Sequence, residues 1–134
     1  MNRFSQGLLG GLLGAAIGFA LTALSFVGLA LLDGARGGEA VGFGLAVGVA
    51  GGAMGGLVGL AVGAFDLGPL GGALAGVAAT LSAVAFYVIV FGNPARLGYF
   101  LRESSIVLLA LGPPAVLTGV LVAAIKNRVA HPTP

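Results

Sequence analysis

The sequence has no cysteine, a single histidine and very few charged residues. The absence of cysteine excludes disulfide bonds, thiolate chemistry and cysteine–metal sites. Only 7% of the residues are charged, whereas soluble domains carry about 25%. This is too little charge to cover a compact domain in water, and 58% of the residues are hydrophobic. Intrinsic disorder is also excluded, so the composition indicates an integral membrane protein.

The few charged residues divide the chain into four uncharged stretches. These stretches are residues 4–32, 40–65, 67–95 and 104–125. A helix crosses the hydrocarbon core with about 20 apolar residues, so each stretch has room for one spanning helix and none has room for two. We therefore predict an all-α fold in which a four-helix bundle forms a single transmembrane domain over residues 1–134.

Helix-breaking residues and polar clusters give the bounds of the predicted elements. The four spans are predicted at residues 6–32, 40–65, 70–91 and 104–125. Before the last span, Tyr99 and Phe100 suit the membrane interface and favour a short interfacial helix over 95–103, with a plain anchored loop as the alternative. Residues 126–134 are predicted to be a loosely held polar tail.

Lysine and arginine are balanced between the two sides of the membrane. Four spans place both termini on one side, with three basic residues beside them and three on the opposite side. The first group is Arg3, Lys126 and Arg128, and the second is Arg36, Arg96 and Arg102. The positive-inside rule therefore gives a near tie. The compact basic pair of the tail favours cytoplasmic termini in a prokaryotic cytoplasmic membrane, and insertion of two copies in opposite orientations is the alternative.

Two segments of the sequence resemble each other at an offset of 61 residues. Residues 7–13 match residues 68–74 at five of seven positions. The same offset places the second span over the fourth, so a duplication would give two parallel repeats of two helices each. Chance similarity between two segments rich in glycine and leucine is the alternative.

Glycines recur every four residues in three of the predicted spans. The second span has two series, Gly44, Gly48, Gly52 and Gly56, and Gly51, Gly55, Gly59 and Gly63; the first span has Gly10, Gly14 and Gly18, and the third has Gly72 and Gly76. Residues four apart share one helix face, and small residues let helices approach closely in lipid. We predict that these glycines form helix-packing interfaces of the glycine-zipper kind, and that the second helix is the most crowded.

Our first hypothesis for function rests on this glycine face. There are two alternatives. The glycine face packs only the helices of one chain against each other, or part of this face packs against another copy or another membrane subunit. No predicted span has an ionisable residue in its middle, which argues against a proton-coupled carrier. We therefore expect a structural or accessory membrane protein that acts by packing within a homo-oligomer or larger complex. We expect the lipid bilayer and other membrane subunits as partners, and no nucleic acid, enzymatic activity, cofactor or metal.

A small channel or carrier for a neutral or small solute is the second hypothesis. Pro113 and Pro114 lie near the middle of the fourth span, where they remove two backbone donors and predict a kink. The kink could line a path together with Thr118 and Tyr87, although neighbouring helices also tolerate a kink of purely structural origin. A polar cavity at mid-membrane beside these residues would favour this second hypothesis.

Overall fold

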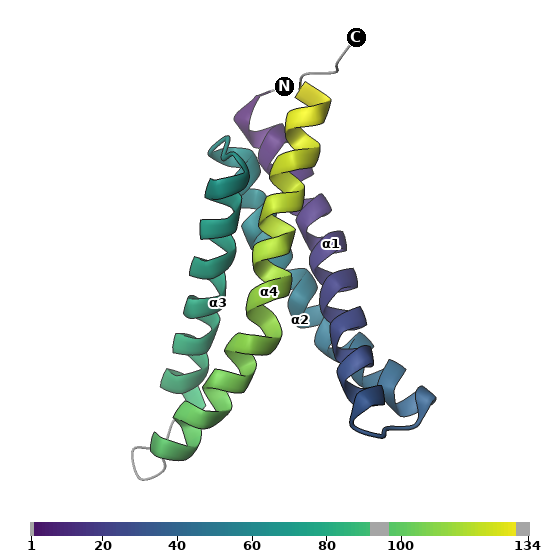
Figure 1. Cartoon of the computed structure of the whole chain (residues 1–134). Helices are drawn as coiled ribbons and strands as arrows, with labels where there is room; N and C mark the ends of the chain where they lie inside the picture. Colours follow the sequence, from purple (N-terminus) through teal and green to yellow (C-terminus); the bar gives the residue numbers. More distant parts are fainter. Residues whose placement is uncertain (1, 92–96, 131–134) are drawn as a thin grey trace.

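The computed structural model describes residues 2–91 and 97–130, which form four α-helices and no strand (Figure 1). The helices are α1 (Arg3–Leu32), α2 (Gly37–Ala64), α3 (Pro69–Phe91) and α4 (Leu97–Ala130). Each contains an apolar stretch long enough to cross a membrane. The predicted all-α, membrane-embedded four-helix bundle is therefore confirmed.

The helix ends follow local backbone chemistry. The side chain of Asn2 caps α1 by accepting a hydrogen bond from the Ser5 backbone N–H at 2.8 Å. The turn between α1 and α2 needs the left-handed conformation at Gly34, where φ is 86° and a side chain would be strained. In the next turn Asp66 takes a φ of 56°, and Pro69 then begins α3, where its missing N–H has no consequence.

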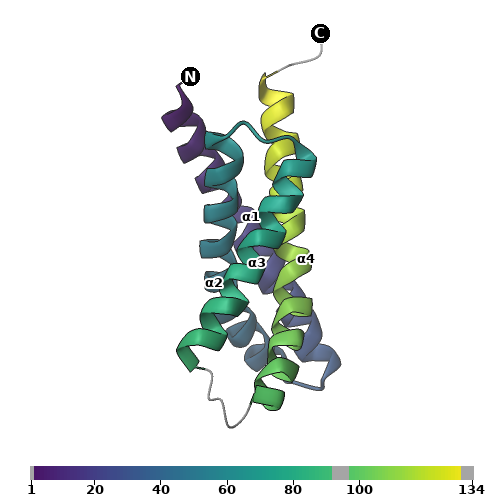
Figure 2. The same ribbon diagram turned by 90° about the vertical axis from the view of Figure 1, so that its left-hand side faces the viewer.

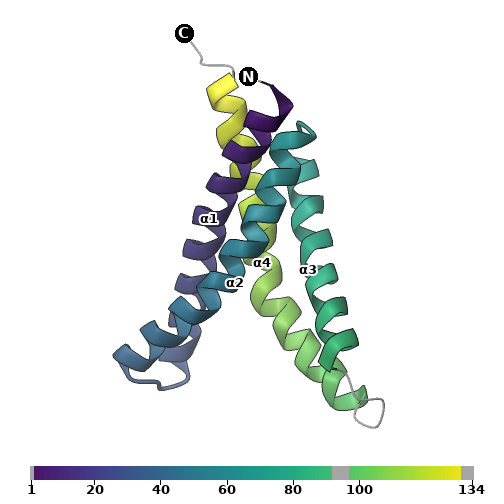
Figure 3. The ribbon, with the colours of Figure 1, turned by 180° about the vertical axis from the view of Figure 1, so that it is seen from behind.

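The four helices form two antiparallel hairpins, α1–α2 and α3–α4. The hairpins contact each other through α2–α4, α1–α4 and α2–α3, and the described residues of α1 and α3 do not meet. Figures 1 and 3 show the hairpins close together at the end where α1 begins and α4 ends, and apart at the other end. We call these the closed end and the open end. The view at right angles in Figure 2 shows that the spread lies in the plane of Figure 1.

A small apolar core joins the two hairpins. Val58 and Val62 of α2 pack with Val122 and Ala123 of α4, and all four are 0–2% exposed. α2 and α4 each contact the three other helices, so α2 shares its central place in the bundle with α4. At the closed end the two hairpins are therefore held together by the packing of α2 on α4 as well as by the turn between α2 and α3.

An ion pair crosses the same junction. The ammonium of Lys126 in α4 contacts the carboxylate of Asp66 in the α2–α3 turn. The Lys126 side chain is 17% exposed and that of Asp66 is 81% exposed. Because a pair that is open to solvent contributes only about 0–1 kcal/mol, the apolar core dominates the junction and the ion pair positions the end of α4 beside the turn.

The beginning of α4 corrects the prediction of a separate interfacial helix over 95–103. From Leu97 onward the backbone already belongs to α4, whereas residues 95 and 96 lie outside the described part of the chain. The physical reason is the lack of a strong helix breaker: between Leu97 and Leu111 only Gly98 has a low helix propensity.

The end of α4 corrects the predicted bounds of the tail. Helical backbone continues past the expected end at residue 125 to Ala130, and residues 131–134 lie outside the described part. Lys126 and Arg128 are good helix formers, and basic side chains suit the last turn of a helix. Pro113 and Pro114 also lie inside the helix, which changes direction near its middle without ending (Figure 1).

Candidate helix-packing interface

The glycines of α1 meet three glycines of the second α2 series, backbone against backbone. The opposed pairs are Gly10 with Gly59, Gly14 with Gly55, and Gly18 with Gly51. A Cβ atom built on any of these six residues would come within 3.0 Å of the opposite backbone, closer than real Cβ atoms approach. Any side chain at these positions would therefore force the two helices apart.

The same geometry brings Cα hydrogens to carbonyl oxygens across the interface. At each opposed pair, the position that a Cβ would take falls against the carbonyl oxygen of the other helix, and in glycine a hydrogen occupies that direction. Contacts of the Cα–H···O type recur at helix–helix interfaces and contribute about 0.5–1 kcal/mol each. Repeated along the hairpin, they add directional contacts to the van der Waals packing.

The other glycines of α2 also face α1, and Gly52 and Gly56 of the first series meet side chains there. A Cβ on Gly52 would lie 3.3 Å from the Phe19 Cβ, and one on Gly56 would lie 3.6 Å from the Ala15 Cβ. The remaining contacts are those of Gly44 with Val27 and Ala23, of Gly48 with Ala23 and Phe19, and of Gly63 with the backbone of Gln6 and Gly7. Both glycine series of α2 are thus covered by one neighbour, α1, within the same chain.

The second hairpin uses a shorter version of this interface. A Cβ on Gly72 of α3 would clash with Gly119 of α4, and one on Gly76 would clash with Ala115. The Thr80 hydroxyl donates a hydrogen bond to the Gly76 carbonyl at 2.9 Å and so remains within its own helix. The sequence analysis did not select Gly119 or Ala115; the signal was present, because small residues recur four apart at 115, 119 and 123.

The two hairpins pack in a similar register. Gly10–Gly59 corresponds to Gly72–Gly119, and Gly14–Gly55 corresponds to Gly76–Ala115. Equivalent positions are thus 62 residues apart in the first helices and 60 apart in the second, close to the offset of 61 in the sequence. The arrangement is the 2+2 topology that the repeat predicts, and common ancestry of the hairpins stays a prediction.

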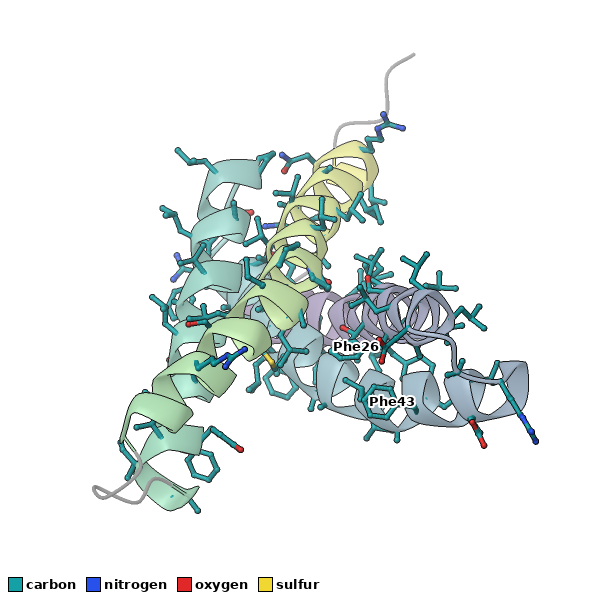
Figure 4. All side chains as sticks on the ribbon, turned by 60° about the horizontal axis from the view of Figure 1, so that its bottom comes forward. Phe26 and Phe43 are labelled. Atoms are coloured by element: carbon teal, nitrogen blue, oxygen red, sulfur yellow. The ribbon has the colours of Figure 1, made fainter. Side chains whose placement is uncertain are left out.

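Two clefts open where the hairpins diverge; the first is apolar, and the second also has Asp33 and Glu39 in its lining. A cleft of about 600 Å³ lies between α2 and α3, with Leu57 and Phe86 in its walls. A second, of about 740 Å³, lies between the first hairpin and α4, beside Ala110. Phe26 and Phe43 line this second cleft, with their ring centroids 5.8 Å apart and their planes at 60° (Figure 4).

The residues considered for a solute path lie in two different places. Pro114 and Thr118 are buried and, with Thr22, border a central space too tight for a water molecule. The Thr118 hydroxyl donates to the Pro114 carbonyl at 2.7 Å. Pro113 and Tyr87 are exposed on the outside of the bundle. The described residues therefore do not bring these four candidates around one cavity.

Comparison of the chain with protein-family models, with curated proteins and with solved structures finds no match. Within residues 2–91 and 97–130, no group of three histidine, aspartate or glutamate side chains could hold a metal ion. Any assignment of function therefore depends on the surfaces and charges of this chain itself.

Proposed function

We propose that this protein is a structural or accessory membrane subunit that acts by helix packing, within a homo-oligomer or a larger membrane complex. The observation that carries the proposal is the V-shaped pair of hairpins, with an apolar cleft between α2 and α3 and a second cleft between the first hairpin and α4. In lipid, helices associate through shape and close contact rather than through a hydrophobic gain. A cleft offers a transmembrane helix contacts on two sides, which a flat helix face does not.

The glycines have a supporting role in this proposal. Glycine-zipper packing makes each hairpin a closely packed unit, and the glycine faces are then covered within the chain. The surface proposed for a partner is therefore the wall of the clefts, in particular the exposed side chains of Leu57 and Phe86. We place the protein in a prokaryotic cytoplasmic membrane with its termini in the cytoplasm.

The lack of cysteine makes a clean crosslinking test possible. Leu57→Cys places a thiol in the α2–α3 cleft, and Leu12→Cys places one on α1 outside both clefts; the two leucines are 66% and 72% exposed. In native membranes, with a benzophenone maleimide attached to the thiol and then irradiated, we expect a larger crosslinked product with Leu57→Cys and none with Leu12→Cys. Mass spectrometry of the product then separates a second copy from a different subunit.

Two results would contradict the proposal. One is a monomer with both variants, supported by a monomer mass in native mass spectrometry of lipid-embedded protein. The other is equal crosslinking of both variants, which would indicate random collision in the membrane rather than a defined contact.

A small channel or carrier for a neutral solute is the second candidate. The observation in its favour is Thr22, which is 2% exposed and whose hydroxyl forms no hydrogen bond within the described part of the chain. This hydroxyl lies beside Thr118 at the central space, so a wider conformation would expose two hydroxyls there. Protein-dependent flux of such a solute into liposomes distinguishes this candidate from a packing subunit.

A further inference from the structure

A partly enclosed apolar groove lies between α1 and α4 near the closed end. Its volume is about 250 Å³. Leu9 and Leu13 of α1 form one wall, and Val122 and Ile125 of α4 form the other. From Gln6 to Leu13 the helix rises by about 10 Å, so the groove follows the outer part of one membrane leaflet.

Gln6 and Lys126 are the two polar side chains that line the groove. Both lie on the terminal side of Leu9, Leu13 and Val122 in their helices, and Val129 lines the groove beyond Lys126. The Lys126 ammonium reaches the α2–α3 turn, where it contacts Asp66, so it lies at the level of the helix ends. An ammonium has three N–H donors, of which the contact with one Asp66 oxygen uses one. The half-buried Gln6 side chain makes no hydrogen bond within the described residues.

The charges of the two ends of the molecule differ. The closed end has three basic residues, Arg3, Lys126 and Arg128, against a single described acidic residue, Asp66. In the sequence, residues 33–39 and 96–103, which follow the first and third spans, carry three acidic residues (Asp33, Glu39 and Glu103) and three basic ones (Arg36, Arg96 and Arg102), which balance. The groove therefore opens at the positively charged end of the bundle, and basic pockets between spanning helices bind anionic lipid headgroups.

We infer that this groove binds an anionic phospholipid from the bilayer. One acyl chain lies along Leu9, Leu13 and Val122, and the phosphate accepts hydrogen bonds from the Lys126 ammonium and the Gln6 amide. A zwitterionic lipid fits the apolar part equally well but gains less from the net positive charge. The inference concerns a face away from the two clefts, so it stands whether or not the clefts bind another subunit.

Photocrosslinking of the full-length protein tests the lipid directly. The probe is phosphatidylglycerol with a photoreactive acyl chain, in nanodiscs of phosphatidylcholine. We expect labelled peptides that contain Leu9, Leu13 or Val122. Lys126→Gln should lower this labelling about fivefold, the value of one basic residue near an anionic surface. Arg102→Gln, at the open end, should leave it unchanged.

A second variant separates lipid binding from the ion pair. Asp66→Asn removes the ion pair but keeps the Lys126 ammonium, so labelling by the phosphatidylglycerol probe should be kept or increased. An equal loss in Asp66→Asn and Lys126→Gln would overturn the inference, because Lys126 would then serve the junction alone.

Competition in the unmodified protein decides the matter even if Lys126→Gln does not fold. Unlabelled phosphatidylglycerol should reduce labelling of the groove more than the same amount of phosphatidylcholine. Equal competition by the two lipids, labelling spread evenly over all exposed helix faces, or a groove closed to the probe by another protein would each overturn the inference.

Discussion

At the scale of single residues, the facing glycines have no side chains, and this allows α1 and α2 to pack closely. In water, each glycine inside a helix costs about 1 kcal/mol relative to alanine, so a stretch such as α2 would be a poor helix on its own. In the bilayer the helix is retained because its backbone groups have no other hydrogen-bond partners. The same glycines then bring the Gly14 and Gly55 backbones together, which alanine would prevent.

Two matched glycine-to-alanine substitutions test this reading. Gly14→Ala puts a Cβ against the Gly55 carbonyl and should destabilise the protein by about 1–3 kcal/mol, the usual cost of overpacking. Gly28→Ala, also in α1, has nothing within 4 Å and should be neutral or slightly stabilising. Reversible denaturation in mixed micelles measures both. Equal stabilities would show that the close backbone contact of α1 and α2 is absent in the folded protein.

At the scale of elements, the bend of α4 separates the part of the helix that joins the hairpins from the part that diverges. Beyond Pro114 toward the C-terminus, Val122 and Ala123 pack on α2. Before Pro113, α4 leaves the first hairpin and continues beside α3 (Figure 1). Two successive prolines cannot complete the backbone ladder, so the direction of the helix changes at that point.

Replacing both prolines should narrow the open end. In Pro113→Ala/Pro114→Ala the backbone ladder is complete and α4 straightens, which brings its first half closer to α2. Spin labels on Leu32→Cys and Arg102→Cys, both exposed, should then show a shorter distance in pulsed electron resonance. A label pair at the closed end, on Phe4→Cys and Val129→Cys, serves as the control and should not change. An unaltered distance at the open end would assign the spread of the hairpins to their packing instead of to the bend.

The helices could be predicted from the sequence, but the pairs of helices that pack against each other could not. Uncharged stretches and breakers such as Gly34 and Pro69 mark the helix ends, because bilayer thickness and turn geometry are local constraints. The prediction failed over 97–103, where Tyr99 and Phe100 suggested a separate interfacial helix although no breaker interrupts the chain. Glycine spacing indicates a face suited to close packing, but it does not say which helix covers that face. Gly52 lies against α1, a contact that depends on the register of two helices.

At the scale of the whole molecule, the closed end combines three features that are not found among the described residues of the open end. It has the apolar junction of α2 and α4, the Lys126–Asp66 ion pair and the excess of basic residues. In the proposed orientation this end faces the cytoplasm, where the inner leaflet is rich in anionic lipid. The end at which the hairpins pack together is thus also the end with the excess of positive charge.

Single-cysteine labelling tests this orientation. Leu32→Cys lies at the open end and Val129→Cys at the closed end; the two residues are 87% and 67% exposed. On intact cells, an impermeant maleimide should label Leu32→Cys at once and Val129→Cys only after permeabilisation. Partial labelling of both from outside would instead indicate insertion in two opposite orientations.

The independence of the two hairpins also bears on how the protein is made. Every opposed pair of the α1–α2 interface lies between residues 6 and 64, so this hairpin needs nothing from the second half of the chain. Chains are synthesised from the N-terminus, and units that fold by themselves do so first. We therefore expect the first hairpin to complete its packing while α3 and α4 are still to be inserted. It then presents Val58 and Val62 as a ready surface on which Val122 docks.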